Sequence, residues 1–313
     1  MPAPREKEHG TYWHAYCPGM DPGEIQKVVE ERWLVSAGTR IHLDVYGKAV
    51  ENLPITIIFI PGTSVYSRFY ASFLYGLYKR GFRIACPDMP GHGLSGGPRG
   101  HFTMEQFVTT IQDVVSWVLN EHGERVVVMG SSLGGITAFY AAASDPRIKA
   151  AVCHNAAILS EGAHERIVKV SGIYKLMKPL VPAISRVVPR MRISVKAYLN
   201  PDTLTRSAGT RAVLDKLFAD PLFTEKYTLT SLATQMKAKL AAPPEYIETP
   251  VMLINGSDDV LFSVDYVREI HDRLARSRGK ALEIIEGGTH FILHEHQDVC
   301  IESIEKWIRK VMA

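Results

Sequence analysis

The stretch that decides the fold is Val126-Val127-Val128-Met129-Gly130-Ser131-Ser132-Leu133-Gly134-Gly135. It joins an apolar run of strand-forming residues to a Gly-x-Ser-x-Gly turn, and a helix-forming stretch, 136–143, follows at once. This order of strand, sharp turn and helix is typical of a nucleophilic serine held at the end of a parallel strand. Of the two adjacent serines, only Ser132 has glycine both two residues before it and two residues after it. Ser132 is therefore the predicted nucleophile, since Ser131 would need glycine at positions 129 and 133.

Short apolar runs alternate with longer helical patterns over most of the chain. This alternation predicts an α/β fold with a mostly parallel central sheet flanked by helices. Two strands at the start, 28–36 and 40–46, are expected to form an antiparallel hairpin, and Thr103 is the expected N-cap of a long helix. The further predicted strands are 55–60, 82–86, 125–129, 149–153, 251–255 and 281–285, and the predicted helices are 69–80, 103–122, 136–143, 264–277 and 293–312.

The alternation stops between residues 160 and 245. This segment is rich in proline and in short amphipathic pieces, and it carries 14 Lys and Arg residues against 7 Asp and Glu residues. We interpret it as a helical cap, or lid, inserted in an α/β core of residues 1–159 and 246–313. Apolar residues between 173 and 181 lie among its cations, so the cap is expected to accept an apolar chain. The excess positive charge favours an anionic substrate, but a solvated basic face explains it equally well.

Composition excludes several classes of protein. A hydrophobic content of 46% and a charged content of 22% are ordinary for a globular protein of 313 residues. No apolar run approaches the ~18 residues that a membrane span needs, and the polar N-terminus, 1–21, does not resemble a secretory signal. The four cysteines lie far apart, which favours a reducing compartment. We expect a cytoplasmic protein with no integral membrane segment and no nucleic-acid partner; its oligomeric state stays open.

Two further side chains complete a predicted catalytic triad. A serine hydroxyl needs a base to take its proton, and that base needs a third group to orient it. The strand 251–255 is followed by Gly256-Ser257-Asp258-Asp259, and the strand 281–285 by Gly287-Gly288-Thr289-His290. Both stretches fall at the carboxyl edge of the sheet, where active sites of open α/β sheets lie. We assign His290 as the base and prefer Asp259 to its neighbour Asp258 because it completes a Gly-x-x-Asp spacing; Asp265 falls inside the next helix.

Acyl transfer also needs hydrogen-bond donors for the oxyanion. The backbone N–H of Leu133, directly after the nucleophile, is one expected donor. The other should come from the loop after strand 55–60, where Pro61 has no N–H, and Thr63 is our choice. Three further residues, Ser131, His154 and Asn155, are expected to contact the substrate or support the hinge of the cap.

The remaining histidines have simpler interpretations. His92 falls in a turn motif and is expected to be structural. A metal site at His290, His294 and His296 is disfavoured because no carboxylate or cysteine set accompanies them at ligand spacing. We therefore predict neither a metal nor another cofactor.

These motifs together resemble the α/β-hydrolase superfamily. The similarity is to its serine-nucleophile branch of monoacylglycerol lipases, lysophospholipases, carboxylesterases and proline iminopeptidases. Besides the Ser132 turn, the stretch Asp88-Met89-Pro90-Gly91-His92-Gly93-Leu94-Ser95 resembles the Asp-x-x-Gly-His-Gly-x-Ser loop of that branch. The resemblance covers about residues 28–312. One departure is Pro61-Gly62-Thr63, where many members have His-Gly, and this change puts the second oxyanion donor in question.

The resemblance and the triad imply a serine hydrolase that cleaves a carboxylic ester through an acyl-serine intermediate. Its partner would be a small-molecule ester, with an anionic ester as one candidate. One alternative is an amidase or aminopeptidase of the same fold, although recognition of an amino group calls for acidic residues that the cap has in small number. The other is a non-catalytic receptor built on a hydrolase fold.

Overall fold

The computed structural model describes residues 12–47, 54–123, 125–167 and 178–313. Its centre is an eight-stranded sheet in the order β1-β2-β4-β3-β5-β6-β9-β10. All neighbours from β4 to β10 pair in parallel, whereas β2 pairs antiparallel with both β1 and β4. The strands are β1 (Val29–Ser36), β2 (Thr39–Tyr46), β3 (Ile55–Ile60), β4 (Arg83–Pro87), β5 (Arg125–Ser131), β6 (Ile148–His154), β9 (Val251–Gly256) and β10 (Ala281–Ile285).

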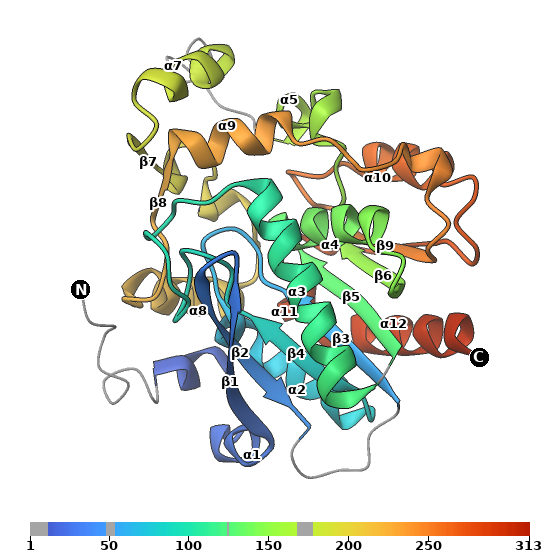
Figure 1. Cartoon of the computed structure of the whole chain (residues 1–313). Helices are drawn as coiled ribbons and strands as arrows, with labels where there is room; N and C mark the ends of the chain where they lie inside the picture. Colours follow the sequence, from blue (N-terminus) through green and yellow to red (C-terminus); the bar gives the residue numbers. More distant parts are fainter. Residues whose placement is uncertain (1–11, 48–53, 124, 168–177) are drawn as a thin grey trace.

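Helices cover both faces of this sheet (Figure 1). Alternate residues of a strand point to opposite faces, and in β5 Val126 and Val128 enter one apolar core while Val127 and Met129 enter the other. The central strands are therefore apolar at nearly every position, as a sheet buried on both sides requires. One core contains residues of α3 (Met104–His122), α4 (Leu133–Ser144) and α10 (Val264–Arg273); the other contains residues of α2 (Ala71–Lys79) and α12 (Gln297–Met312).

The predicted fold class and the opening hairpin are confirmed. Thr103 is the N-cap of α3, where its side chain accepts a hydrogen bond from the Gln106 N–H. Several helix boundaries differ from the prediction: the helix predicted over 69–80 is α2, and the one predicted over 136–143 is α4, which begins at Leu133. The helix expected over 264–277 ends at Arg273. The last predicted helix is broken at His296 into α11 (Ile292–Glu295) and α12.

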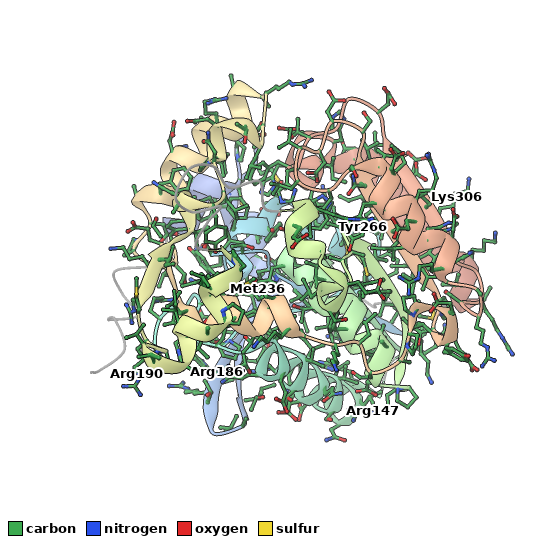
Figure 2. The ribbon with its side chains drawn as sticks, turned by 90° about the horizontal axis from the view of Figure 1, so that it is seen from above. Arg147, Arg186, Arg190, Met236, Tyr266 and Lys306 are labelled. Atoms are coloured by element: carbon green, nitrogen blue, oxygen red, sulfur yellow. The ribbon has the colours of Figure 1, made fainter. Side chains whose placement is uncertain are left out.

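The chain between β6 and β9 is mainly helical but also contains strands. Strands β7 (Arg192–Ser194) and β8 (Lys226–Thr228) form a separate antiparallel pair, which the interpretation as a purely helical insertion missed. Its described α-helices are α5 (Ala163–Ile167), α7 (Val181–Val187), α8 (Ala208–Ala219) and α9 (Leu229–Lys237). The exposed Arg186 lies in α7, and the exposed Arg190 lies just after it (Figure 2). Most of the apolar stretch expected at 173–181 lies outside the described residues, as does most of the N-terminus expected to lack a signal.

No helix within the described ranges is long and apolar enough to cross a membrane. All four cysteines are buried and carry free thiols. Cys86 and Cys153, at the ends of β4 and β6, belong to the two cores of the sheet.

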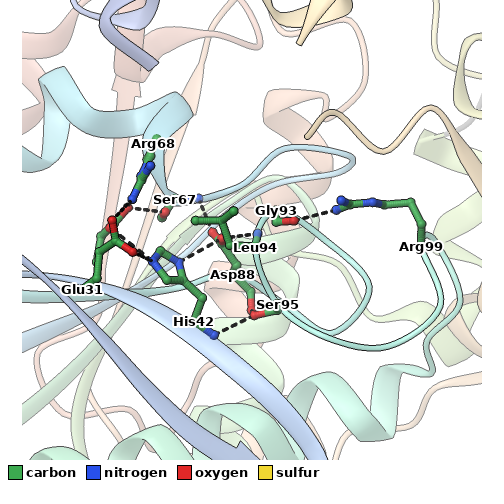
Figure 3. A network of polar contacts seen from close by, with 10 residues as sticks. Glu31, His42, Ser67, Arg68, Asp88, Gly93, Leu94, Ser95 and Arg99 are labelled. Atoms are coloured by element: carbon green, nitrogen blue, oxygen red, sulfur yellow. Dashed lines mark hydrogen bonds and ion pairs between the residues drawn. The ribbon is translucent and has the colours of Figure 1, made fainter. Parts of the chain in front are cut away.

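A buried network of charges ties the antiparallel end of the sheet to the loop after β4 (Figure 3). The His42 ring is fully buried, with Nδ1 3.1 Å from the Asp88 carboxylate and Nε2 3.4 Å from that of Glu31. Asp88 also accepts hydrogen bonds from the N–H groups of Ser67 and Leu94. Burial alone would lower the pKa of His42, but the charges of Asp44 and Asp88 and its hydrogen bonds raise that pKa to about 10.

This network predicts a loss of stability in alkaline solution. The folded pKa of His42 lies above its ordinary value of 6.5, so its contribution is complete below pH 6.5 and is lost as the pH rises toward 10. We expect Tm to fall between pH 7 and 10.5 in thermal unfolding followed by circular dichroism. The His42→Gln variant should be less stable at pH 7 and show a shallower fall. The partly exposed His271 supplies the control His271→Gln, and equal slopes in all three proteins would contradict the prediction.

Candidate active site

The turn between β5 and α4 holds Ser132 in a strained conformation. Its φ of 56° and ψ of −119° are unusual for a residue with a side chain. A Cβ on Gly130 would meet the Gly134 carbonyl oxygen at 2.2 Å, and one on Gly134 would meet the Ile60 carbonyl oxygen at 2.0 Å. The missing side chain at Gly130 therefore lets β5 lie close to the start of α4, and the missing side chain at Gly134 lets α4 lie close to the end of β3. The Ser132 N–H donates to the His154 carbonyl at 2.9 Å, which fixes the turn against β6.

His290 and Asp259 form a buried pair at the carboxyl edge of the sheet. The His290 Nδ1 lies 2.9 Å from one carboxylate oxygen of Asp259, and both residues are 7% exposed. The other oxygen accepts hydrogen bonds from the N–H groups of Leu261 and Phe262. Burial would raise the pKa of Asp259, but the charge and hydrogen bond of His290 and the Phe262 N–H outweigh it, and the pKa falls to about 2. The carboxylate is therefore ionised and oriented toward the imidazole.

The neighbouring acids lie in different surroundings. The Asp258 side chain is one-third exposed and pairs with Arg206, and the Asp265 side chain is 96% exposed. Neither is placed as Asp259 is, with one oxygen on His290 and the other on backbone N–H groups.

Ser132 and His290 line one cavity of about 90 Å³ together with Thr63. Nearly half of its lining residues come from the segment between β6 and β9, and all of these but one are apolar, among them Leu199, Leu214 and Phe218. Lys196 is the only Lys, Arg, Asp or Glu residue in the described wall of this cavity. Its ammonium lies 4.1 Å from the centre of the Phe218 ring. The cavity can thus accommodate an apolar chain beside a hydroxyl and an imidazole.

The loop after β3 brings a second group of backbone donors to this cavity. Leu133 is the first residue of α4, so its N–H has no partner within the helix. Across the cavity, the Gly62 N–H is already hydrogen-bonded to the Tyr70 hydroxyl. Thr63, which lines the cavity, is then the next N–H available after Pro61.

Tyr227 of β8 holds this loop from the other side. Its fully buried hydroxyl accepts a hydrogen bond from the Ser64 N–H at 2.7 Å and lies 2.8 Å from the His92 Nε2. Ser64 has a φ of 70°, a strained value for a residue other than glycine. Burial lowers the pKa of His92 to about 4, so this ring is neutral. Tyr227 therefore holds the segment between β6 and β9 next to Thr63, and the hydrogen bond to His92 supports this position.

The three further residues expected near the substrate have different positions. Ser131 lines the cavity, and its hydroxyl lies 2.9 Å from the His154 Nδ1. His154 and Asn155 are completely buried and are not part of the cavity wall. The Asn155 side-chain amide instead donates to the Asp259 carboxylate at 3.0 Å.

Two residues at the site were not singled out in the sequence. Tyr70 lines the cavity, and the Phe262 ring is stacked on that of His290, with centroids 5.9 Å apart and planes inclined by 8°. In the sequence Tyr70 is an ordinary position at the start of the predicted helix 69–80, and Phe262 is an apolar position just before the predicted helix 264–277, so no local signal marks them.

Among the described residues, no group of three or more His, Cys, Asp or Glu side chains could hold a metal ion. His294 contacts Phe69 instead, with ring centroids 4.5 Å apart.

The amino-acid sequence is similar to those of known proteins. An uncharacterized abhydrolase domain-containing protein of Dictyostelium discoideum is 24% identical over 259 residues, which cover 82% of this chain and 26% of that protein. The chain thus spans about a quarter of the length of that relative. Phospholipase YtpA of Bacillus subtilis is 23% identical over 246 residues, 76% of this chain and 88% of that protein.

Solved structures share the fold. The monoacylglycerol lipase of Paleococcus ferrophilus superposes with a TM-score of 0.69 at 22% identity, covering 85% of this chain and 99% of the lipase. The profile of the family described as "Serine aminopeptidase, S33" matches residues 53–297, more than three quarters of the chain. The chain therefore belongs to this serine aminopeptidase family of α/β hydrolases.

Proposed function

We propose that the protein is a serine hydrolase that cleaves carboxylic esters, with Ser132 as nucleophile, His290 as base and Asp259 as the acid that orients it. The observation that carries the proposal is the shared cavity. The strained Ser132 and the His290 imidazole line this one cavity, and the Nδ1 of the imidazole lies 2.9 Å from an ionised, buried carboxylate. These residues supply the three groups that such catalysis needs, namely a nucleophile, a base and a group that orients the base.

The proposed reaction proceeds through two tetrahedral intermediates. The Ser132 oxygen attacks the ester carbonyl carbon while the His290 Nε2 takes the serine proton. The N–H groups of Leu133 and Thr63 donate hydrogen bonds to the oxyanion. When the intermediate collapses, the bond to the alcohol breaks and the imidazolium gives its proton to the leaving oxygen. Water then attacks the acyl-serine with His290 again as base, releasing the carboxylic acid and restoring Ser132.

We further propose that residues 160–245 form a cap that selects the substrate. This segment supplies Leu199, Leu204 and Phe223 among other apolar residues of the cavity wall, which favours a substrate with an apolar acyl or alkyl chain. The names of two similar proteins, a monoacylglycerol lipase and a phospholipase, point to the same class of lipid ester. Lys196 at the wall favours an ester that also carries an anionic group.

Aminopeptidase activity, suggested by the family description, receives less support from the cavity. Recognition of a free amino group requires an acidic partner, and the described wall of the cavity contains no Asp or Glu. A receptor without catalysis is also disfavoured, because binding alone does not require a strained serine and an ionised carboxylate aligned on one imidazole.

We place the protein in the cytoplasm. Its four buried cysteines carry free thiols, and free thiols persist in reducing compartments. Fractionation of the cells that produce it tests this assignment.

The anionic preference can be tested with matched pairs of esters, one neutral and one carrying a carboxylate at the end of the chain. We expect Lys196→Ala to lower kcat/KM for the anionic ester by about fivefold at low salt, since an exposed charge pair contributes up to about 1 kcal/mol. The neutral ester should be unaffected, and high salt should reduce the difference. Arg190→Ala removes an exposed cation outside the cavity wall and serves as the control (Figure 2). Equal kcat/KM for both esters in the wild type would rule out the anionic preference.

A further inference from the structure

A chain of hydrogen bonds leads from the buried His154 to the cavity through Ser131 and Tyr70. The His154 Nδ1 lies 2.9 Å from the Ser131 Oγ, and the Ser131 side chain is hydrogen-bonded to the Tyr70 hydroxyl. The same hydroxyl accepts the N–H of Gly62. Tyr70 is 5% exposed and lines the cavity that holds Ser132 and His290. The proposed mechanism gives these hydrogen bonds no role.

Which atoms donate in these hydrogen bonds follows from the protonation of His154. Burial lowers the pKa of His154 to about 3, so the ring is neutral and only one nitrogen carries hydrogen. Its Nε2 is buried and has no hydrogen-bond partner among the described residues. Buried N–H groups without a partner are rarer than buried acceptors without one. The hydrogen therefore belongs on Nδ1, which donates it to the Ser131 oxygen.

The remaining hydrogens are then determined in turn. Because the Ser131 oxygen accepts from His154, its own O–H donates to the Tyr70 oxygen. That oxygen also accepts from Gly62, so the O–H of Tyr70 is left to point elsewhere. A Cβ placed on Gly62 would lie 3.0 Å from the Tyr70 hydroxyl and 3.5 Å from the Ser132 Cβ. The Tyr70 hydroxyl and Ser132 thus lie on either side of Gly62, in the loop after β3 that also contains Thr63.

We propose that the Tyr70 O–H is a third hydrogen-bond donor to the oxyanion formed on Ser132, and that Ser131 and His154 are positioning residues that orient it. The inference rests on the proposed ester hydrolysis. It involves no further proton transfer, since Tyr70 keeps its proton and only donates a hydrogen bond to the charge that develops on the carbonyl oxygen. Tyr70 would thus add a side-chain donor next to the loop after β3, where Pro61 has no N–H and the N–H of Gly62 is already engaged.

Steady-state kinetics of Tyr70→Phe test the proposal. Loss of one oxyanion donor typically costs about 100-fold or more in kcat, so we expect kcat to fall by about that factor with KM within twofold of the wild type. A trifluoromethyl ketone, which forms the same oxyanion on the serine, should bind more weakly by the same factor. Ser131→Ala should lower kcat by about tenfold at constant KM, because Gly62 still anchors the Tyr70 oxygen.

Tyr66→Phe is the matched control. Tyr66 is a second buried tyrosine in the same part of the chain, its hydroxyl donates to Asp220 at 2.6 Å, and it is not part of the cavity wall. Its variant should lose thermal stability and keep the wild-type kcat. If Tyr70→Phe keeps kcat and ketone affinity within threefold of an active wild type, the role of Tyr70 is wrong while the proposed function stands. An inactive wild type would remove both.

The tautomer of His154 gives a test that needs no variant. Nitrogen-15 NMR of the labelled wild-type protein should show the hydrogen on Nδ1. A hydrogen on Nε2 would reverse the chain, direct the Tyr70 O–H toward Ser131 and overturn the proposal.

Discussion

Ser132→Ala should reduce ester hydrolysis by about 10⁶-fold, the loss seen when the nucleophile of a serine triad is removed. The adjacent hydroxyl of Ser131 should not replace it, because Ser131 is engaged with His154 at 2.9 Å, whereas Ser132 has the strained backbone of the turn after β5. Turnover of a p-nitrophenyl ester of medium chain length provides the measurement. Covalent labelling by a fluorophosphonate probe, followed by mass spectrometry of the labelled peptide, identifies the modified residue directly.

Ser131→Ala distinguishes the two adjacent serines. The Ser131 hydroxyl is engaged with His154 at 2.9 Å, so this variant should still be labelled by the probe, and on Ser132. Labelling that persists in Ser132→Ala, or that disappears only in Ser131→Ala, would exclude the assigned nucleophile. A wild-type protein that reacts with neither ester nor probe would leave only the receptor interpretation.

Asp259→Asn should lower kcat by about 10⁴-fold, as expected when the acid of a triad loses its charge and the imidazole takes the wrong tautomer. The neutral amide would accept the Nδ1 hydrogen of His290 more weakly, or donate to that nitrogen and turn its base function away from Ser132. The amide is nearly isosteric with the carboxylate, so the contacts with the N–H groups of Leu261 and Phe262 limit the change in structure. Comparison of kcat with Tm separates the catalytic effect from destabilisation.

Asp258→Asn is the control that the chain itself supplies. Asp258 is adjacent and one-third exposed, and it pairs with Arg206 instead of His290. Its replacement should change kcat by less than twofold. A large loss in this variant combined with an active Asp259→Asn would reverse the assignment of the acid.

Local sequence was sufficient for the parts of the site that lie in one turn. The Ser132 turn could be predicted because its glycines, apolar strand and helix are consecutive, and the ends of β9 and β10 carry their polar residues in the same way. The choice between Asp258 and Asp259 is harder to make from the sequence, because the two residues are adjacent and have nearly the same neighbours. It becomes clear only from the distance to His290, which lies 31 residues further along the chain.

Contacts across long separations could not be predicted. The pair of β7 and β8 joins short strands with little pattern of their own. Tyr70 reads as a buried position at the start of a helix, and its hydroxyl gains meaning only beside Ser131, which follows 61 residues later in sequence. The support that Asn155 gives to Asp259 crosses 104 residues. The fold class and the turn that carries Ser132 could therefore be predicted from local sequence, whereas the fine positioning of the side chains around it depends on tertiary structure.

Tyr227 has a consequence for any attempt to change specificity by exchanging whole segments between relatives. It lies in the segment that supplies nearly half of the cavity wall, yet its hydroxyl holds the strained Ser64 next to Thr63. A chimera that received a foreign segment without a tyrosine at this place would lose the hydrogen bond that holds the loop of Thr63 and Ser64, along with its old substrate preference. New specificity in this scaffold has to be transplanted with the Tyr227 contact intact, or introduced one wall residue at a time.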